Sequence, residues 1–303
     1  MAPAPQAVIE VEGRSLTLSN LDKVLYPATG FTKAEVLDYY ARIAPVLLPH
    51  LGDRALTLRR FPDGVEGGSF YEKNCPRYRP DWVGVHRVGG DDGIIDFCRI
   101  DSLASLTWVV NLAALELHTS MARAADADTP TMVVFDLDPG PPAGMRECAE
   151  IALWIRDVLA DVGLTCVAKT SGSKGIQVYL PLNTPATYAG TAAFSKGVAQ
   201  LLERQAPDRV VSVQRKNLRT GKVLVDWSQN SRHKTTVCVY SLRARERPTV
   251  STPITWDEVR AAVDAGDGSG LSFETSAVLR RVADHGDLFS VTTDLQQELP
   301  VLG

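Results

Sequence analysis

The stretch Thr131-Met-Val-Val-Phe-Asp136-Leu-Asp138-Pro-Gly140 carries the most structural information in this chain. Its apolar, β-branched residues predict a buried β-strand, which Pro139 and Gly140 end. Side chains two residues apart on a strand point to the same face, so the two aspartates should project together and repel each other. The pattern predicts a divalent-metal site whose oxygen ligands favour Mg²⁺ or Mn²⁺ over zinc. The alternative is a surface turn, because Asp before Pro-Gly is common in turns.

Composition indicates a globular chain without membrane or secretion signals. The 303 residues are 45% apolar and 22% charged, enough for one large domain or two modest ones. No apolar run is long enough to span a bilayer, and the start Met1-Ala-Pro-Ala-Pro-Gln6 lacks the features of a signal peptide. We therefore expect a cytoplasmic protein with no membrane partner.

The cysteines predict reduced, mostly buried thiols. Their number is odd and none forms a C-x-x-C pair, which argues against a disulfide framework or a zinc ribbon. The five cysteines are Cys75, Cys98, Cys148, Cys166 and Cys238.

The distribution of charge is more informative than the net charge of −4. Nine basic and two acidic residues lie between Val211 and Arg247, and a second basic region lies between Arg54 and Arg79. Such clusters fit a phosphate-rich partner, although a basic stretch is often only a solvated face.

The periodicity predicts a mixed α/β (α+β) fold. Thr32-Lys-Ala-Glu35 is a capping box that opens an amphipathic helix, and Thr255-Trp-Asp-Glu258 caps another. Further helices are expected over Ser102–His118, from about Ala143 to Val162, over Thr191–Leu202 and in the C-terminal segment. Strands are expected over Met132–Asp138, Leu164–Lys169, Gly175–Leu180, Val210–Gln214 and Lys222–Trp227. Without a repeat or an obvious linker, residues 1–303 are expected to form a single domain with a core of about 18–288 and a short flexible N-terminal tail.

Three further motifs bear on the metal site. Lys222-Val-Leu-Val-Asp226 is a second apolar strand that ends in a carboxylate, and a third acidic ligand is what a two-metal phosphoryl-transfer site requires. Ser171-Gly-Ser-Lys-Gly175 is a tight turn suited to binding phosphate through backbone N–H groups and one ammonium, although it is not a Walker A loop. His118 is expected at the end of an apolar helix, where a core histidine is the alternative to a functional one.

Five motifs together resemble a known family. In chain order they are Asp22-Lys-Val-Leu-Tyr-Pro-Ala-Thr-Gly30, Phe135-Asp-Leu-Asp-Pro-Gly140, Thr170-Ser-Gly-Ser-Lys-Gly175, Lys222-Val-Leu-Val-Asp-Trp-Ser-Gln-Asn230 and Lys234-Thr-Thr…Tyr240-Ser-Leu-Arg243. The chain resembles, from about Leu18 to Leu288, the polymerase domain of bacterial ligase D and its stand-alone actinobacterial relatives. These belong to the archaeo-eukaryotic primase superfamily, so the resemblance implies a primase-like catalytic core with mixed sheets flanked by helices.

The resemblance implies template-directed addition of nucleotides, with a preference for ribonucleotides, to a primer 3′-hydroxyl. Asp136, Asp138 and Asp226 match the catalytic ligands of two divalent ions, Mn²⁺ or Mg²⁺. Positions that match those holding the incoming nucleoside triphosphate are His118, Ser171, Lys174, Gln229 and Arg243, with Arg59 and Arg60 near its phosphates. Where the family commonly has histidine, this chain has Gln177, which can donate a hydrogen bond to the triphosphate but cannot carry charge.

Other matching positions imply DNA with a gap or break that carries a 5′-phosphate. Lys23 and Lys33 match a pair that grips this phosphate, and Phe70 with Tyr71 matches an aromatic pair that stacks on the template. Solvated lysines and ordinary core aromatics are the alternatives. Arg215–Lys222 matches a mobile loop near the primer terminus, with Arg219 as its expected contact.

The implied setting is DNA repair by a nucleoid-associated bacterial protein, expected to be monomeric. No ligase motif is evident, so a separate DNA ligase is expected to seal the product, and a DNA-end-binding protein is a further expected partner. There are two alternative functions. One is a non-catalytic DNA-end adaptor, which Gln177 leaves open. The other is a HAD-type phosphatase, which also uses a strand followed by Asp-x-Asp but expects Gly-Thr after it and a paired acidic motif later.

Overall fold

The computed structural model describes residues 6–90 and 93–300. The helices of this part are α1 (Lys33–Leu51), α2 (Leu103–Asn111), α3 (Met145–Asp161), α4 (Tyr188–Gln205), α5 (Trp256–Ala265) and α6 (Thr275–His285). The mixture of helices with several sheets confirms the predicted α/β (α+β) class.

The larger sheet positions most of the expected catalytic residues. Its order within the described residues is β15 (Val210–Val211), β16 (Val223–Asp226), β12 (Met132–Pro139), β14 (Ile176–Pro181), β13 (Val167–Thr170) and β18 (Pro253–Ile254). The central strand β12 runs antiparallel to both β14 and β16, whereas β15 and β16 are parallel.

Strict alternation along β12 separates the core from the site. Three alternate residues pack into the core beneath α3, α4 and α5: Val133, Phe135 and Leu137. Met132 and Val134 on the other face join a second core, and Asp136 and Asp138 continue that face beyond it. The period-2 pattern therefore directs both aspartates away from the helices.

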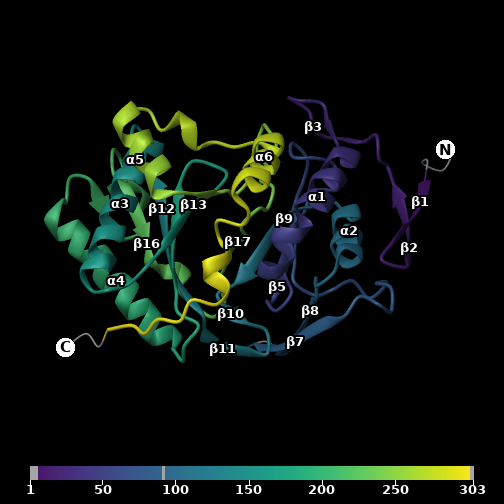
Figure 1. Ribbon diagram of the computed structural model, residues 1–303, viewed down its shortest axis with the longest axis horizontal. Coiled ribbons are helices and arrows are strands. Elements are labelled where there is room, and N and C mark those ends of the chain that lie inside the picture. Colours follow the sequence, from purple (N-terminus) through teal and green to yellow (C-terminus); the bar gives the residue numbers. More distant parts are fainter. Residues whose placement is uncertain (1–5, 91–92, 301–303) are drawn as a thin grey trace.

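The smaller sheet belongs to the second core. Its order is β17 (Thr235–Val237), β9 (Ala114–Ser120), β5 (Leu56–Arg60) and β6 (Phe70–Glu72). The helices α1 and α2 pack against one another, and their apolar residues share a core with those of β5 and β9. In Figure 1 the strands of both sheets lie between α3, α4 and α5 on one side and α1 and α2 on the other.

Short hairpins complete the described part of the chain. They pair β1 (Gln6–Val11) with β2 (Arg14–Ser19), β3 (Val24–Tyr26) with β4 (Phe31–Thr32), β7 (Val85–Gly90) with β8 (Gly93–Cys98) and β10 (Ala122–Arg123) with β11 (Asp126–Pro130). The first hairpin spans the expected core boundary at Leu18, because β1 and most of β2 precede that residue. Residues 1–5 of the expected tail lie outside the described residues, and the single-domain organisation stays a prediction.

Both predicted capping boxes are confirmed. Thr32 and Thr255 each accept a hydrogen bond from a backbone N–H three residues on, and Glu35 and Glu258 bond back to the cap. The expected helix over Ser102–His118 is wrong in its second half, because α2 ends at Asn111 and β9 begins at Ala114. A continuous apolar run does not distinguish a buried helix from a buried strand, and here pairing with β5 decides.

The prediction of five reduced thiols is wrong for one pair. Cys75 and Cys98 form a disulfide, because the loop after β6 brings Cys75 beside β8, where its N–H bonds to the carbonyl of Asp96. Cys148, Cys166 and Cys238 are buried free thiols, as predicted. Among the helices of the described residues, none is long and apolar enough to cross a membrane.

Candidate active site

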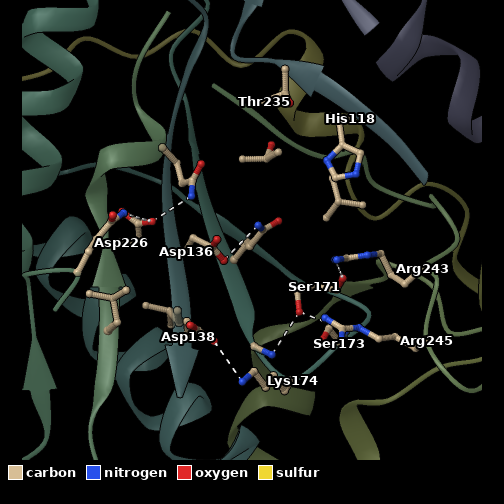
Figure 2. A pocket seen from close by; sticks show the side chains of 18 of the residues that line it. His118, Asp136, Asp138, Ser171, Ser173, Lys174, Asp226, Thr235, Arg243 and Arg245 are labelled. Atoms are coloured by element: carbon tan, nitrogen blue, oxygen red, sulfur yellow. Dashed lines mark hydrogen bonds and ion pairs between the residues drawn. The ribbon is translucent and has the colours of Figure 1, made fainter. Parts of the chain in front are cut away.

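A cavity of about 400 Å³ lies between the two sheets. Its lining comes from β12, β14 and β16 of the larger sheet, from β9 and β17 of the smaller sheet, and from the turn before β14, the loop before β16 and the segments after β16 and β17 (Figure 2). One side, which we call the carboxylate wall, consists of Asp136, Asp138 and Asp226. The other side, which we call the cationic wall, consists of His118, Arg243 and Arg245.

Strand pairing brings the three carboxylates together. Asp136 of β12 lies directly opposite Asp226 of β16 in the antiparallel register, and Asp138 shares the face of Asp136. Burial raises the pKa of Asp136 to about 6, and the nearby charges of Asp226 and Asp138 add to that rise. The structure therefore brings the three side chains together at one cavity, and their role as metal ligands stays a prediction.

Each carboxylate already has side-chain partners. The Gln177 amide donates to Oδ1 of Asp136 at 3.2 Å, and the Gln229 amide donates to Oδ2 of Asp226 at 3.0 Å. The Arg219 guanidinium donates to Oδ2 of Asp138 at 3.1 Å. Among residues 6–90 and 93–300, no three His, Cys, Asp or Glu side chains are already arranged to hold a metal ion.

The donor set nevertheless fits a hard divalent cation. Three carboxylates offer oxygen ligands, which Mg²⁺ and Mn²⁺ prefer. Burial and mutual repulsion disfavour the charged form of Asp136, and a cation between the carboxylates would remove that penalty. Binding would require the donors on Asp138 and Asp226 to give up some of their hydrogen bonds.

The Ser-Gly-Ser-Lys-Gly turn joins β13 to β14 at the mouth of the cavity. Oγ of Ser171 accepts hydrogen bonds from the N–H groups of Ser173 and Gly175, each at 3.2 Å. A Cβ on Gly175 would lie 2.1 Å from the carbonyl oxygen of Leu137, so only glycine fits there. The largely exposed Lys174 directs its Nζ to within 4.0 Å of Asp138 (Figure 2).

A buried glutamate organises the cationic wall. Glu116 is 1% exposed, and its carboxylate accepts from Nε2 of His118 at 2.9 Å and from Nε of Arg243 at 3.1 Å. The Ala244 N–H and the Arg59 guanidinium also donate to it. Burial opposes ionisation, but these donors outweigh it and hold the pKa of Glu116 well below its ordinary value. Burial likewise lowers the pKa of His118.

The cavity receives most, but not all, of the predicted nucleotide-binding residues. Six of these residues line it: His118, Ser171, Lys174, Gln177, Gln229 and Arg243. Arg59 reaches Glu116 from behind the wall, whereas Arg60 lies on the other face of β5, where it pairs with Glu72 and bonds to the carbonyl of Leu112. The structure thus places Arg59 and Arg60 on opposite faces of one strand and neither among the cavity-lining residues.

The aromatic pair lies on the edge strand β6. Phe70 is 45% exposed and Tyr71 is 60% exposed, so neither is a core residue. The guanidinium of Arg60 lies over the Phe70 ring, and that of Arg59 lies over the Tyr71 ring. Tyr71 also meets the ring of His118 edge to face, with centroids 5.7 Å apart. Tyr71 therefore contacts the cationic wall from outside the cavity, through His118.

Lys23 and Lys33 form a separate basic pair beside the β3–β4 hairpin. The backbone N–H of Lys33 donates to the carbonyl of Lys23 at 2.8 Å. Lys33 is buried, with its Nζ 2.6 Å from the carbonyl of Ser19, whereas Lys23 is partly exposed and pairs with Asp63. Burial, and then the Lys23 charge, lowers the pKa of Lys33 to about 8. In Figure 1 β3 lies on the opposite side of the molecule from β16.

The loop that contains Arg219 closes against the carboxylate wall. The short helix η1 (Lys216–Leu218) precedes Arg219, whose guanidinium bonds to Asp138 and to the carbonyl of Gln214. The backbone of Arg219 is so close to Gly140 that a Cβ there would lie 2.0 Å from its carbonyl oxygen. Gly140 thus ends β12 and also admits this loop.

Sequence reasoning missed three side chains that hold the site together. They are Glu116, Lys169 and Gln214. Glu116 and His118 stand two apart, a strand signal that the expected helix over Ser102–His118 concealed. Lys169 lies in a predicted strand, and an i to i+8 pairing across a turn would have placed it opposite Gln177. No local signal distinguishes Gln214 from an ordinary polar loop residue.

Comparisons with known proteins match this arrangement. The family model of the LigD primase-polymerase domain matches residues 32–289. The multifunctional non-homologous end joining DNA repair protein LigD of Mycobacterium tuberculosis is 43% identical over 281 residues, which cover 90% of this chain and 36% of that protein. The bifunctional non-homologous end joining protein LigD of Bacillus subtilis is 32% identical over 272 residues, covering 89% of this chain and 43% of that protein.

A solved structure gives the same result. The polymerase domain from Mycobacterium tuberculosis ligase D, in complex with DNA, superposes with a TM-score of 0.85 at 42% identity. The match covers 92% of this chain and 98% of that chain. The present chain spans about a third of the length of the mycobacterial relative.

Proposed function

The chain belongs to the LigD primase-polymerase family, and on that premise we propose that it is a template-directed nucleotidyltransferase. It would extend a primer 3′-hydroxyl across a short gap or break in DNA during repair. The observation that carries the proposal is the cavity in which a wall of three carboxylates faces a wall that contains the guanidinium groups of Arg243 and Arg245. A nucleoside triphosphate would use both walls. Cations bind its phosphates, and its reaction requires metal ions held by carboxylates.

The residues that would hold divalent ions are Asp136, Asp138 and Asp226. When bound, a pair of Mn²⁺ or Mg²⁺ ions would promote deprotonation of the attacking hydroxyl and stabilise the charge that develops on the phosphates. Gln177 and Gln229 orient two of these carboxylates through amide N–H donors. Because these neutral donors do not cancel the charge of Asp136 and Asp226, the two carboxylates stay attractive to cations, whereas Asp138 would first have to release Arg219.

The cationic wall and the serine-lysine turn would bind the triphosphate. The Arg243 guanidinium and the Lys174 ammonium supply positive charge from opposite sides of the cavity, and Ser171 anchors the turn between them. Glu116 fixes Arg243 and His118 in place before any ligand arrives. Such preorganisation means that little reordering is needed when the phosphates bind. A sugar pocket that prefers ribonucleotides is part of the proposal.

DNA would contact the molecule at three places outside the cavity. Lys23 and Lys33 would grip the 5′-phosphate on the far side of a gap, since two ammoniums can form charge-assisted hydrogen bonds with one phosphate. The exposed Phe70 and Tyr71 would stack on template bases without regard to sequence. Arg219 would exchange its contact with Asp138 for one near the primer terminus.

The wider setting is also part of the proposal. The relatives are named as end-joining proteins of which this chain covers a part, so a DNA ligase and a DNA-end-binding protein are natural partners in sealing the product. We propose that the chain acts as a monomeric single domain in the cytoplasm, where it associates with the nucleoid. A HAD-type phosphatase does not fit the strand order, because the strand that carries Asp136 is antiparallel to both of its neighbours.

Primer extension across a short gap tests the proposal. A labelled primer with a 5′-phosphorylated downstream strand would be incubated with ribonucleotides or deoxyribonucleotides, in Mn²⁺ or in Mg²⁺. We expect templated addition that favours ribonucleotides and depends on the 5′-phosphate. Tight DNA binding without addition under any of these conditions would instead identify a non-catalytic end-binding adaptor.

A further inference from the structure

One charged side chain in the larger sheet has no place in the mechanism described so far. Lys169 lies on β13 and is 1% exposed, so its ammonium is buried within the protein. Burial of a lysine amine is costly unless hydrogen bonds satisfy it. Burial lowers the pKa of Lys169 to about 7. An apolar residue at this position would avoid that cost, so the presence of a lysine here needs an explanation.

The contacts of Lys169 lead to the carboxylate wall. It pairs with Gln177 across the β13–β14 register, and its Nζ donates to Oε1 of Gln177 at 2.5 Å. Nζ also donates to Oγ of Ser251 at 2.7 Å, since the Ser251 hydroxyl in turn donates to the carbonyl of Thr170. Both bonds require only two N–H groups, which the protonated and the neutral amine each possess.

These contacts decide which way the Gln177 amide faces. The hydroxyl of Tyr179 also donates to Oε1 of Gln177, at 3.4 Å, so the amide oxygen faces two donors on the inner side. The NH₂ group must then face the cavity, where it donates to Oδ1 of Asp136 at 3.2 Å. A glutamine whose oxygen had no donors could also turn that oxygen toward the carboxylate, where two acceptors would repel and the hydrogen bond would be lost.

We propose that Lys169 is a positioning residue for nucleotidyl transfer, which acts through Gln177 to hold Asp136 in its reactive orientation. The inference rests on the proposed function and extends it to a residue outside the cavity lining. It also accounts for Gln177. A neutral glutamine beside Asp136 can act as an obligatory donor because an amine fixed on the neighbouring strand occupies its oxygen.

A double-mutant cycle tests the relay. Lys169→Met and Gln177→Met each remove one link while keeping an unbranched side chain of similar length. Loss of a partner behind a metal ligand commonly costs 10- to 100-fold, so we expect kcat to fall about tenfold in each variant. The KM values for nucleotide and for gapped DNA should change less than about twofold. The double variant should lose no more than either single variant, because both act on one chain of contacts.

A spectroscopic readout separates positioning from stability. The side-chain NH₂ signals of Gln177, identified by their loss in Gln177→Met, should be dispersed and slow to exchange in the parent protein. In Lys169→Met they should move toward free-amide positions and exchange faster, without metal, nucleotide or DNA. Lys169→Gln, which retains an N–H donor, should restore part of both the signals and kcat. It also serves as the second variant if Lys169→Met does not fold.

The matched control is Lys196→Met. Lys196 also places its ammonium over an aromatic ring, that of Trp227, as Lys169 does over Tyr179, but it is exposed. Its loss should leave the Gln177 signals and kcat unchanged. Unaltered Gln177 signals in Lys169→Met, or losses that multiply in the double variant, would overturn the inference. If the parent extends no primer, the proposed function fails, but the amide signals still test the relay.

Discussion

The two walls of the cavity are held in place by opposite means. On the carboxylate wall the holders are mostly neutral: Gln177 donates to Asp136, and Gln229 donates to Asp226. On the cationic wall the holder is a buried charge, because Glu116 accepts from both His118 and Arg243. These neutral donors therefore hold Asp136 and Asp226 without cancelling their charge, whereas Asp138 is paired with the Arg219 cation and the second wall has part of its positive charge neutralised.

This difference matches what each wall is proposed to bind. Divalent ions are strongly hydrated, and a carboxylate cluster attracts them only if its charge is not already cancelled. A triphosphate is larger and flexible, so its site benefits more from fixed geometry than from maximal charge. Substitutions in the carboxylate wall should therefore act mainly through loss of charge, and substitutions in the cationic wall mainly through loss of order.

The largest effect is expected for Asp136→Asn. The substitution keeps the shape of the side chain and removes the charge. Loss of several kcal/mol of transition-state stabilisation corresponds to roughly a thousandfold or greater fall in kcat for primer extension. Burial and repulsion already disfavour the charged form of Asp136, so the melting temperature should stay the same or rise. DNA binding, measured by fluorescence anisotropy, should survive.

The control for this variant is Asp53→Asn. Asp53 pairs with Arg123 at the surface, and its loss should leave extension intact. If kcat for primer extension by Asp136→Asn is within tenfold of the parent value, the assignment of Asp136 as a metal ligand is wrong. A large fall in its stability would contradict the view that the carboxylates are held at a cost.

The next largest effect is expected for Glu116→Gln, on stability. Removing the charge leaves the mostly covered Arg243 without its buried counter-ion, and breaking such a pair costs about 3 kcal/mol of the free energy of unfolding. The folded-state pKa of Glu116 lies below its ordinary value of 4.5, so its contribution is present above that value. As pH falls below it the contribution shrinks, so the parent and variant curves should converge. Denaturant unfolding at pH 7 and in acid measures this.

Glu72→Gln is the matched control on the same sheet. Glu72 pairs with Arg60 away from the cavity and is partly exposed, so its loss should cost less than about 1 kcal/mol. Glu116→Gln should also raise the KM for nucleotide more than it lowers kcat. If both variants cost the same, Glu116 has no special role in ordering the cationic wall.

The sequence predicts the carboxylate wall better than the cationic wall. Asp136 and Asp138 are two apart on one strand that periodicity identifies, so local geometry alone places them together. Asp226 follows from a second strand of the same kind. The capping boxes at Thr32 and Thr255 are equally local and were predicted correctly.

The cationic wall depends on contacts that no local pattern contains. Glu116 and Arg243 are 127 residues apart, and the strand that carries Glu116 was predicted as a helix because its apolar run fits both structures. Arg59 and Arg60 were expected to act together, but adjacent residues on a strand face opposite ways. The Cys75–Cys98 disulfide likewise depends on which loop lies beside β8, which cysteine spacing does not reveal.

A smaller effect is expected for Lys23→Ala combined with Lys33→Ala. Both ammoniums must leave existing partners, Asp63 and the carbonyl of Ser19, to bind a phosphate, so the net gain is about 1.5 kcal/mol and the preference for a 5′-phosphorylated gap should fall about tenfold. Because the pKa of Lys33 is lowered to about 8, the preference of the parent should also weaken between pH 7 and pH 9 as this lysine loses its proton. Binding constants for gaps with and without the phosphate measure both.

Arg42→Ala controls for loss of an exposed cation from the same helix as Lys33. It should leave the phosphate preference unchanged. Equal use of phosphorylated and unphosphorylated gaps by the parent would dismiss the pocket, since neither wall of the cavity supplies this selectivity.

The smallest effects are expected for Tyr71→Ala and Phe70→Ala, which lie at the outer edge of the comparison. Both rings are exposed, so neither loss should lower the melting temperature much, and loss of stacking on a base should weaken binding of gapped DNA about tenfold. The two should differ in one respect. Tyr71 meets His118 and lies under Arg59, so its loss should also raise the KM for nucleotide, whereas Phe70 lies under Arg60 on the other face. If the two variants have the same KM for nucleotide, Tyr71 does not contribute to the nucleotide site, and the cationic wall consists only of the residues that Glu116 holds.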